Sequence, residues 1–565
     1  MSSDLGVDMS WGPDAVYGHF GLDLTGPNGG VVRIDDIAIE DITGAFLSDM
    51  VGLVDVRDFG ALGDGSTDDH AAFEAADAAA DGRDILIPEG VFFLGDSVTM
   101  DSRCRFLGTV TMSDSHYLTL QQNFNLPDYI DAFGSGELAF RKAFQSMLKG
   151  PDHVELDMAG LKIDLREPID LHAAVPDVDS FSNRRVISNG QLSVVPGPNW
   201  DTETFTSQAT YNPNDPRTLT NVQNVANIPV GSLVEGNGVG REVYVRSKNV
   251  GQETIELSLP LHDASGTQNY TFRRFKYMLD FTGFNRISRF SIDNIEFLCR
   301  GDCNALILPP TGIGFHLRDC WVNAPRERGI TSHGTGCQGM MIDRCQFVSN
   351  ESALLVAQRT TIGCNLNAND VKIRNNRCRF FRHFAVIGGT SSIISGNHFF
   401  QGDSGPVGPR TAILVMANTN SRATIEGNYI CDGSIEWTNE RDPAPEFNSE
   451  FSFSAMSITG NTFLSQSTSP SFNFILVKPF GTDHFINGLM VTGNTFRLID
   501  GNIDRVEGID TTFAELNFER FKNIHFTANA YNGVNTLVES PLVWRHDENS
   551  PQSTWVVTQI GRAHV

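Results

Sequence analysis

The stretch ITGNTF at Ile458–Phe463, with its near copy VTGNTF at Val491–Phe496, decides how this chain folds. The same phrase, built as apolar, two small or polar residues, Asn or a substitute, any residue, apolar, occurs nine times between residues 292 and 531. The copies are IDNIEF from Ile292, LRDCWV from Leu317, IDRCQF from Ile342, IRNNRC from Ile373, ISGNHF from Ile394, IEGNYI from Ile425, ITGNTF, VTGNTF and FTANAY from Phe526. Successive copies begin 25, 25, 31, 21, 31, 33, 33 and 35 residues apart.

A phrase that returns every 20 to 50 residues or so is typical of repeat proteins, because one unit cannot bury its own apolar face and must stack on its neighbours. This phrase alternates like a short strand and turns at Gly-Asn or Asn-Asn, which favours β units over helical pairs. Weaker copies at Leu156–Leu161 and Ile187–Leu192 extend the pattern upstream. The sequence therefore predicts an all-β chain that forms a parallel β-helix.

The fourth position of the phrase predicts how the turns are held together. It is Asn in six successive copies, namely Asn376, Asn397, Asn428, Asn461, Asn494 and Asn529. Stacked amides at one turn satisfy buried polar groups along the whole coil. We expect these asparagines to be structural.

Composition limits the classes of function. A solenoid grows along one axis, so 565 residues with 40% hydrophobic content do not require many domains. The net charge of −26 and the pI near 4.8 argue against nucleic acid as the main partner. No run approaches about 18 apolar residues, and the first residues lack a basic start and an apolar core, so we expect neither a membrane span nor a signal peptide.

The nine cysteines are expected to serve as small apolar residues, with Cys320, Cys345 and Cys378 at inward or turn positions of the repeat. Cys299 and Cys303 have no second pair at the spacing of a zinc site. We therefore expect no disulfides, no metal and no cofactor.

The stretch VDVRDFGALGDGSTDDHAAFEAADAAADGRDILIPEGVFFL, from Val54 to Leu94, opens the coil. It predicts a strand over 55–60 and a short Ala-rich helix over 67–80, with Ser66 and Asp69 as a capping pair. Such a helix covers the open edge of the first turn. The nearby acidic residues lack the Gly and the terminal Glu of a calcium loop.

DFGALGDGSTDD at 58–69, the Ala-rich helix and ILIPEGVFFL at 85–94 resemble the opening motif of the pectate-lyase-like, right-handed parallel β-helix superfamily. That superfamily includes polygalacturonase-related enzymes and phage tailspike-type polysaccharide depolymerases. The resemblance implies the fold without fixing a reaction. The polygalacturonase motifs are missing, and SHGTG around His333 is the nearest fragment, so hydrolase, lyase and epimerase all stay open.

The chain divides into six parts by these patterns. They are an attachment head over 1–50; the opening motif, capping helix and first turns over 51–198; an inserted β-module over 199–277; the main turns over 278–535; the start of a C-terminal region over 536–559; and IGRAHV over 560–565. The last six residues are what ATC GGA AGA GCA CAC GTC of a common sequencing adapter encodes, so we expect them to be read-through.

Counting nine or ten places from the start of each phrase puts Asp302, Glu327, Glu351 and His383 on four consecutive turns. Turns of a β-helix lie about 4.8 Å apart, so neighbouring carboxylates would be about 5 Å apart and alternate ones about 10 Å. Retaining and inverting glycosidases use carboxylate pairs in this range, and close carboxylates raise one another's pKa.

Within this column we expect Glu351 to be the general acid, Asp302 or Glu327 the base or nucleophile, and His383 a substrate contact. Nearby Arg326, Arg328, Arg379 and Arg382 are candidates for binding uronate or sulfate groups. The alternatives are chance alignment among 68 acidic residues and salt pairing between these side chains.

The resemblance implies a tailspike-like depolymerase that hydrolyses a bacterial surface or extracellular polysaccharide. The alternatives are a non-catalytic receptor-binding spike or adhesin, and a polysaccharide lyase or epimerase. Without an expected export signal, the chain suits a virion component made in the cytoplasm, attached to a phage or gene-transfer-agent particle through residues 1–50. The same resemblance implies a homotrimer.

Overall fold

A computed structural model describes residues 52–150, 152–402, 410–447 and 451–538, with Gly29, Asn549 and Pro551 as single positions. The expected head, the expected read-through end and all but three residues of the expected C-terminal region therefore lie outside the described ranges, apart from those three single positions.

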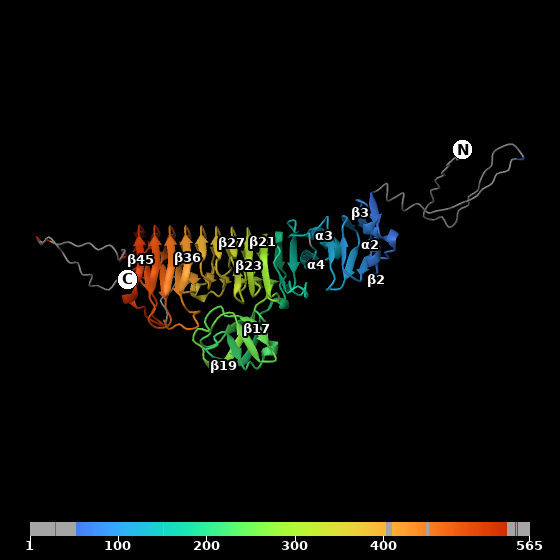
Figure 1. Ribbon diagram of the computed structural model, residues 1–565. Helices are drawn as coiled ribbons and strands as arrows, with labels where there is room; N and C mark the ends of the chain where they lie inside the picture. The colour runs from blue at the N-terminus through green and yellow to red at the C-terminus, as the bar shows by residue number, and fades with distance from the viewer. Residues whose placement is uncertain are drawn as a thin grey trace. The chain divides into compact units, whose positions relative to one another are not determined.

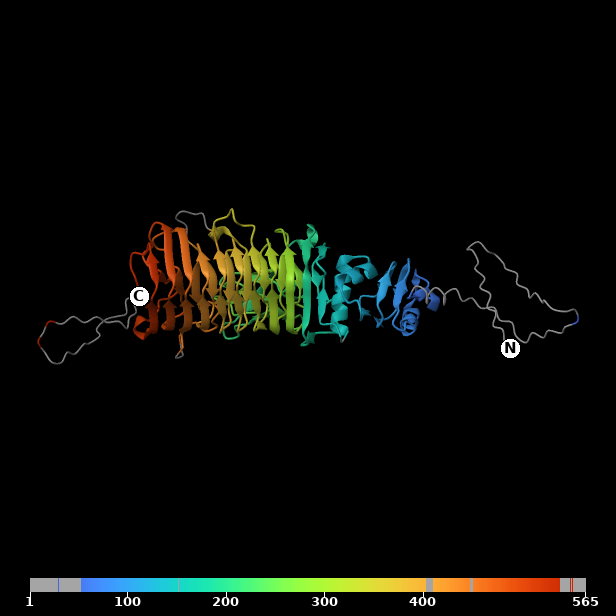
Figure 2. The same cartoon turned by 90° about the horizontal axis from the view of Figure 1, so that it is seen from above.

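Three strands make one turn of the coil. In one such turn β30 (Lys372–Arg374) and β31 (Arg377–Arg379) carry the phrase, and β32 (His383–Ile387) completes it. Each strand pairs in parallel with its counterpart one turn on, so Ile373 pairs with Ile394 of the next copy. Figures 1 and 2 show these turns stacked along one axis. The prediction of a right-handed parallel β-helix is confirmed.

Strands that carry the phrase, and their upstream counterparts, form one parallel sheet, with 22 strands in the described chain. They are β9 (Glu155–Asp157), β10 (Lys162–Leu165), β12 (Ser180–Phe181), β13 (Arg185–Val194), β21 (Arg286–Leu298), β23 (Thr311–Arg318), β24 (Trp321–Asn323), β26 (Gly336–Gln338), β27 (Met341–Asp343), β28 (Gln346–Val348), β30, β31, β33 (Ile393–Ser395), β34 (His398–Phe400), β36 (Asn420–Glu426), β37 (Tyr429–Cys431), β39 (Phe453–Thr459), β40 (Thr462–Ser467), β42 (Ile486–Thr492), β43 (Thr495–Asp500), β45 (Lys522–Thr527) and β46 (Ala530–Asn532). The weak upstream copies belong to it, since Leu156 pairs with Ile187 and Ile187 with Ile292.

The third strand of each turn joins a second parallel sheet, with ten strands in the described residues. They are β11 (Ile169–Asp170), β20 (Tyr277–Asp280), β22 (Asn304–Ile307), β25 (Arg328–Thr331), β29 (Ile362–Leu366), β32, β35 (Ala412–Met416), β38 (Ser434–Thr438), β41 (Ile475–Lys478) and β44 (Glu507–Ile509). Inward side chains such as Leu366 join the main core, while outward Tyr277 and Ile307 pack against Leu233 and Phe275. Burial on both faces explains the nearly continuous apolar runs of these strands.

The asparagine ladder forms as expected. The Oδ1 atom of Asn428 accepts hydrogen bonds from the backbone N–H and the Nδ2 of Asn397, both at 2.9 Å, and its own Nδ2 donates to the Ile394 carbonyl at 2.9 Å. The residue before each Asn has a left-handed backbone, with φ of 65° at Gly460 and 67° at Gly493. That conformation explains the Gly-Asn pairs of the phrase.

The N-terminal turns differ in detail from the prediction. Residues 55–60 form the end of β1 and a 3₁₀ helix, and α2 (His70–Ala78) is shorter than expected. The proposed Ser66–Asp69 capping pair is wrong. The Asp69 carboxylate instead accepts from the backbone N–H groups of Leu62 at 2.7 Å and Gly63 at 3.1 Å, which ties the preceding turn to the helix.

Small sheets complete these first turns. Their strands are β1 (Leu53–Asp55), β2 (Asp64–Asp68), β3 (Asp84–Ile87), β4 (Val91–Leu94), β5 (Val98–Met100), β6 (Cys104–Phe106), β7 (Thr109–Met112) and β8 (Leu118–Leu120). Two helices that the sequence analysis did not predict follow, α3 (Leu126–Phe133) and α4 (Gly136–Lys149). None of the helices in the described part of the chain is long and apolar enough to cross a membrane. The 3₁₀ helices are Val56–Phe59, Pro198–Trp200, Val225–Asn227, Val356–Gln358 and Phe518–Arg520.

The predicted inserted module is a six-stranded antiparallel sheet with its own apolar core, and it projects from one flank of the coil (Figure 1). Its strands are β14 (Glu203–Tyr211), β15 (Thr218–Thr220), β16 (Leu233–Glu235), β17 (Val245–Asn249), β18 (Thr254–Leu257) and β19 (Gly266–Arg274). The module lies against the outer face of the ten-stranded sheet, where its Leu233 and Tyr244 pack with Tyr277 and Ile307.

Candidate functional site

Five of the turn residues that precede strands of the ten-stranded sheet form a line along the coil. The strand register pairs Leu306 with Ile330, and pairs Arg328 with Ile362 and Ile362 with His383. The residues one or two places before these strands therefore lie on successive turns, and we call five of them the turn row. They are Asp302, Arg326, Glu327, Thr361 and Arg382.

Glu327 is the carboxylate of the turn row with the most defined position. Its Oε1 accepts from Thr202 Oγ1 at 3.2 Å and lies 3.4 Å from Arg326 Nε, while its Oε2 accepts from Asn304 Nδ2 at 3.1 Å. The side chain is 12% exposed. Thr202 lies directly before the first strand of the module, so Glu327 lies where the module meets the coil.

Glu351 does not take its expected place in a column of carboxylates. The register neighbour of Glu327 is Thr361, because the loop over 349–361 shifts the count. This loop turns back, so that the Glu351 carboxylate accepts from the backbone N–H of Thr360 at 3.0 Å and of Thr361 at 2.9 Å, and from Thr360 Oγ1 at 3.1 Å. Loop folding, not strand stacking, brings Glu351 beside the turn row.

Asp302 is half-buried on the turn before Glu327, and Arg326 donates its backbone N–H to the Cys303 carbonyl at 2.8 Å. The strand register extends to Asp302 beside Arg326 and Cys303 beside Glu327, so the two carboxylates lie on neighbouring turns but one residue out of register. Arg326 is exposed, and its guanidinium lies 3.7 Å from Asp201 as well as beside Glu327. This part of the junction between module and coil combines the carboxylates of Asp302 and Glu327 with the exposed guanidinium of Arg326.

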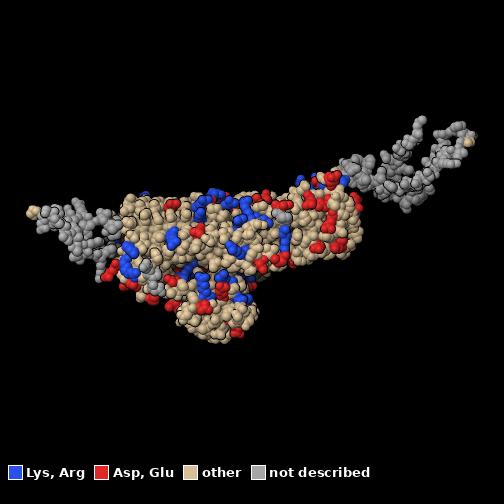
Figure 3. Space-filling view, in the orientation of Figure 1, with Lys and Arg blue, Asp and Glu red and all other residues tan. Residues whose placement is uncertain are grey.

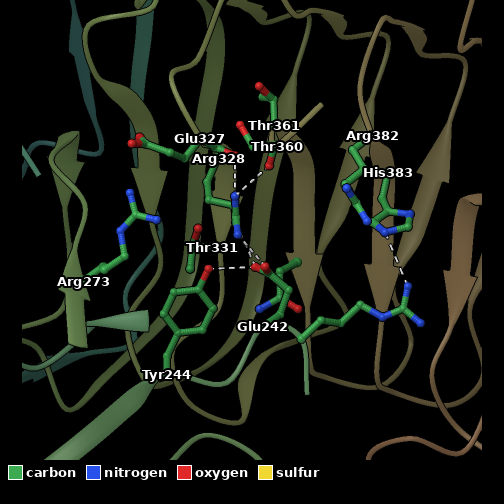
Figure 4. Close-up of polar contacts among 12 residues, drawn as sticks. Glu242, Tyr244, Arg273, Glu327, Arg328, Thr331, Thr360, Thr361, Arg382 and His383 are labelled. Atoms are coloured by element: carbon green, nitrogen blue, oxygen red, sulfur yellow. Dashed lines mark hydrogen bonds and ion pairs between the residues drawn. The ribbon is translucent and has the colours of Figure 1, made fainter. Parts of the chain in front are cut away.

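Arg328 lies under the module and not on an open surface. Its guanidinium donates to Glu242 at 2.6 and 3.0 Å, and Glu242 also accepts from the Tyr244 hydroxyl at 2.7 Å (Figure 4). Burial alone would lower the pKa of Arg328, but the Glu242 carboxylate raises it above its usual value. This ion pair joins module to coil.

Arg382 and Arg379 occupy the edge of the site. Arg382 donates to the carbonyls of Ala357 at 3.0 Å and Arg359 at 3.1 Å, which braces the 349–361 loop, and burial lowers its pKa. The Arg379 guanidinium lies 4.7 Å from the centre of the Phe380 ring. Arg382 is thus largely engaged by the protein itself.

His383 is buried and faces the module. Its Nδ1 lies 2.6 Å from the Ala412 carbonyl and its Nε2 lies 3.4 Å from Arg241 Nη1. Burial, with the neighbouring Arg241 cation, holds its pKa well below the usual value. The expected substrate contact at His383 therefore has no open surface around it.

The sequence analysis missed the residues of the module that complete this region. Arg241 donates to Glu440 at 2.7 and 2.8 Å and also binds Glu436. These partners are 199 and 195 residues away in the chain. No local motif marks such pairs.

Charge is unevenly distributed on the coil. Figure 3 shows Asp and Glu gathered over the N-terminal turns and Lys and Arg over its middle. Within the described residues no group of three or more His, Cys, Asp or Glu side chains is placed to hold a metal ion. The nine cysteines are buried thiols, and burial raises the pKa of Cys337 to about 12.

No protein-family model matches the sequence, and no curated protein sequence matches it significantly. Solved structures align over most of the chain. They include the surface adhesin PfbA of Streptococcus pneumoniae, 11% identical over 85% of this chain and 99% of that chain, with a TM-score of 0.26. The catalytic unit of a GH87 alpha-1,3-glucanase from Streptomyces thermodiastaticus is 12% identical over 87% and 71%, with a TM-score of 0.34. A mutant tailspike protein of E. coli bacteriophage HK620 in complex with a hexasaccharide is 11% identical over 86% and 67%, with a TM-score of 0.32. At these values the fold rests on the strand pairing of this chain itself.

Proposed function

We propose that the chain binds a bacterial surface or extracellular polysaccharide along the turn row and hydrolyses its glycosidic bonds. The observation that carries the proposal is the pair Glu327 and Asp302 on neighbouring turns, beside the exposed cation of Arg326. Neighbouring turns lie about 4.8 Å apart, and glycosidases use carboxylates about 5 to 9.5 Å apart, so a pair that is one turn and one residue apart supports this assignment.

We assign the proton donor to Glu327, because it lies on the turn next to Asp302, whereas the Glu351 carboxylate accepts four hydrogen bonds from Thr360 and Thr361 of its own loop. Glu327 donates its proton to the glycosidic oxygen as the bond to the anomeric carbon breaks. Asp302 acts as base toward a water molecule or as nucleophile. Arg326 binds hydroxyl or acidic groups of the sugar, and Glu351 and Arg382 keep the loop in place.

The test is reducing-end release from purified bacterial polysaccharides by the full chain. Glu327→Gln and Asp302→Asn should each lower the rate at least about 100-fold while binding persists. Glu89→Gln, an exposed glutamate on the N-terminal turns, is the matched control and should cleave normally. Full activity in Glu327→Gln would contradict the assignment. Ultraviolet absorbance of unsaturated ends, measured in parallel, would indicate a lyase.

A non-catalytic receptor-binding spike or adhesin is the second candidate. It is favoured by the number of site side chains that already have protein partners, Glu327 and Glu351 among them. Binding of a polysaccharide without any release of ends, in parent and variants alike, would establish it in place of hydrolysis.

We also propose that the chain acts as a homotrimer in a virion, attached through residues 1–50. This proposal is supported by the resemblance of the opening motif at 58–69 to tailspike-type proteins. Sedimentation velocity tests the assembly, because a mass of one chain at micromolar concentration would exclude a stable trimer.

A further inference from the structure

A shallow groove lies on the outer face of the 22-stranded sheet, away from the strands that the module covers. Its volume is about 460 Å³, which is within the range of about 300 to 1,000 Å³ typical of ligand sites. Gly160 and Gly190 line it, so no side chain fills it there. A side chain at Gly190 would also clash with Met158, since its Cβ would lie 2.6 Å from that side chain.

Trp321 lines the groove and is 52% exposed. It opens β24, and alternation along the strand turns its neighbour Val322 into the core. The strand register places Trp321 next to Glu296, and Glu296 next to Gln191, on three successive turns. An exposed indole beside polar groups is a feature of binding surfaces, because leaving it in water has a free-energy cost.

The polar groups of the groove are held in place before any ligand arrives. Gln191 Nε2 donates to Glu296 Oε2 at 2.5 Å, and Asn294 Nδ2 donates to Asn189 Oδ1 at 3.1 Å. Both asparagines have left-handed backbones, with φ of 58° at Asn189 and 52° at Asn294. Within the described residues no hydrogen bond engages Glu296 Oε1 or Gln191 Oε1, so acceptor atoms remain for a ligand.

We propose that this groove binds a neutral or N-acetylated sugar unit of a polysaccharide, separately from any cleavage at the turn row. A pyranose has an apolar face of C–H groups and a rim of hydroxyls. The first fits the indole of Trp321, and the second fits the acceptors of Gln191 and Glu296. The Glu296 carboxylate repels uronates, which selects against acidic sugars.

Trp321 and Glu327 lie on the same turn of the coil, six residues apart. Six extended residues span at most about 20 Å, so one polysaccharide chain of several sugar units can reach both places. The groove does not depend on hydrolysis, however, because its sugar contacts come from the other sheet.

Binding of the full chain to an array of neutral, N-acetylated and uronate oligosaccharides tests the proposal, followed by calorimetric titration of the bound members. Trp321→Ala should weaken binding at least about tenfold, as removal of a central aromatic contact does. Glu296→Gln should allow uronates to bind. The matched control is Tyr429→Ala, an aromatic side chain 36% exposed in the same register column, and it should bind as the parent does.

Several outcomes would contradict the proposal that this groove binds a neutral or N-acetylated sugar. These are unchanged affinity in Trp321→Ala, binding of uronates alone by the parent, or no binding tighter than about 1 mM to any array member. If Trp321→Ala changes the sedimentation of the protein but not its sugar binding, this face is instead a contact between copies of the chain. If Glu327→Gln cleaves normally but Trp321→Ala binds weakly, only the proposed hydrolysis at the turn row fails.

Discussion

Asn428 shows what one residue contributes to the coil. It is buried within the ladder, and its amide bonds to the turn before it and the turn after it. In Asn428→Ala the Asn397 backbone N–H and the Ile394 carbonyl lose their partners. We expect this to lower the free energy of unfolding by about 2 to 4 kcal/mol, measured by urea denaturation, because each unpaired buried group costs about 1 to 3 kcal/mol.

The matched control is Asn502→Ala, an exposed amide that donates to Asn535 at 3.1 Å. An exposed pair can bond to water instead, so we expect a change within about 0.5 kcal/mol. Equal losses in both variants would mean that the ladder does not stabilise the fold.

Single residues also show why the ladder could be predicted and the site could not. The position of each ladder Asn follows from the repeated phrase around it, which can be read directly from the local sequence. The position of Glu351 depends on how the 349–361 loop turns back, and loop length carries no such information. His383 follows Arg382 by one residue, and one step along a strand reverses which face a side chain meets. Offset counting therefore put Asp302 and Glu327 on neighbouring turns but one residue out of register, and it misplaced Glu351 and His383.

At the scale of elements, the module is held to the coil by buried ion pairs. Glu242 of the module is 2% exposed, and it accepts hydrogen bonds from Arg328, the first residue of β25 in the coil. Arg328→Met leaves that carboxylate buried without its cation. We expect a loss of about 3 to 5 kcal/mol in the free energy of unfolding, measured by urea denaturation.

The double variant Glu242→Gln/Arg328→Met tests the cause. It removes both charges and keeps an acceptor for the Tyr244 hydroxyl. Most of the lost stability should return, since a buried pair contributes little over neutral groups. A double variant as unstable as the single one would show that packing of Arg328, including its position over the Phe275 ring, dominates.

Elements differ in how far the sequence predicts them. The module is visible because the phrase stops and short alternating strands begin. How the module packs against the coil could not be predicted, since Glu242 and Arg328, which join them, are 86 residues apart in the sequence. The sequence analysis did not predict helices α3 and α4, although both have a local start signal. Asn125 and Ser135 are their N-cap residues, and each side chain accepts a hydrogen bond from a backbone N–H, that of Asp128 and that of Leu138 respectively.

At the scale of the whole molecule, buried histidines make the stability of the coil depend on pH. Burial, with the nearby Arg274 cation, lowers the pKa of His333 to about 4, and burial also holds that of His383 well below its usual value. Both are therefore neutral in the folded protein at pH 7. In the unfolded chain a histidine has a pKa near 6.5.

The unfolded chain thus binds more protons than the folded one as pH falls below about 6.5, so acid favours unfolding. The contribution of His333 is fully present above pH 6.5 and is lost as pH falls toward 4, by up to about 3 kcal/mol. Urea denaturation from pH 7 to pH 4 should show this loss of stability. Carboxylates such as Asp280 add to the loss, because burial raises the pKa of Asp280 but the Arg274 cation lowers it further, so that the net pKa is below its usual value. His333→Gln should flatten the slope between pH 6.5 and 4 whatever its stability at pH 7, because Gln does not titrate. An unchanged slope would mean that His333 gains its proton without unfolding the coil.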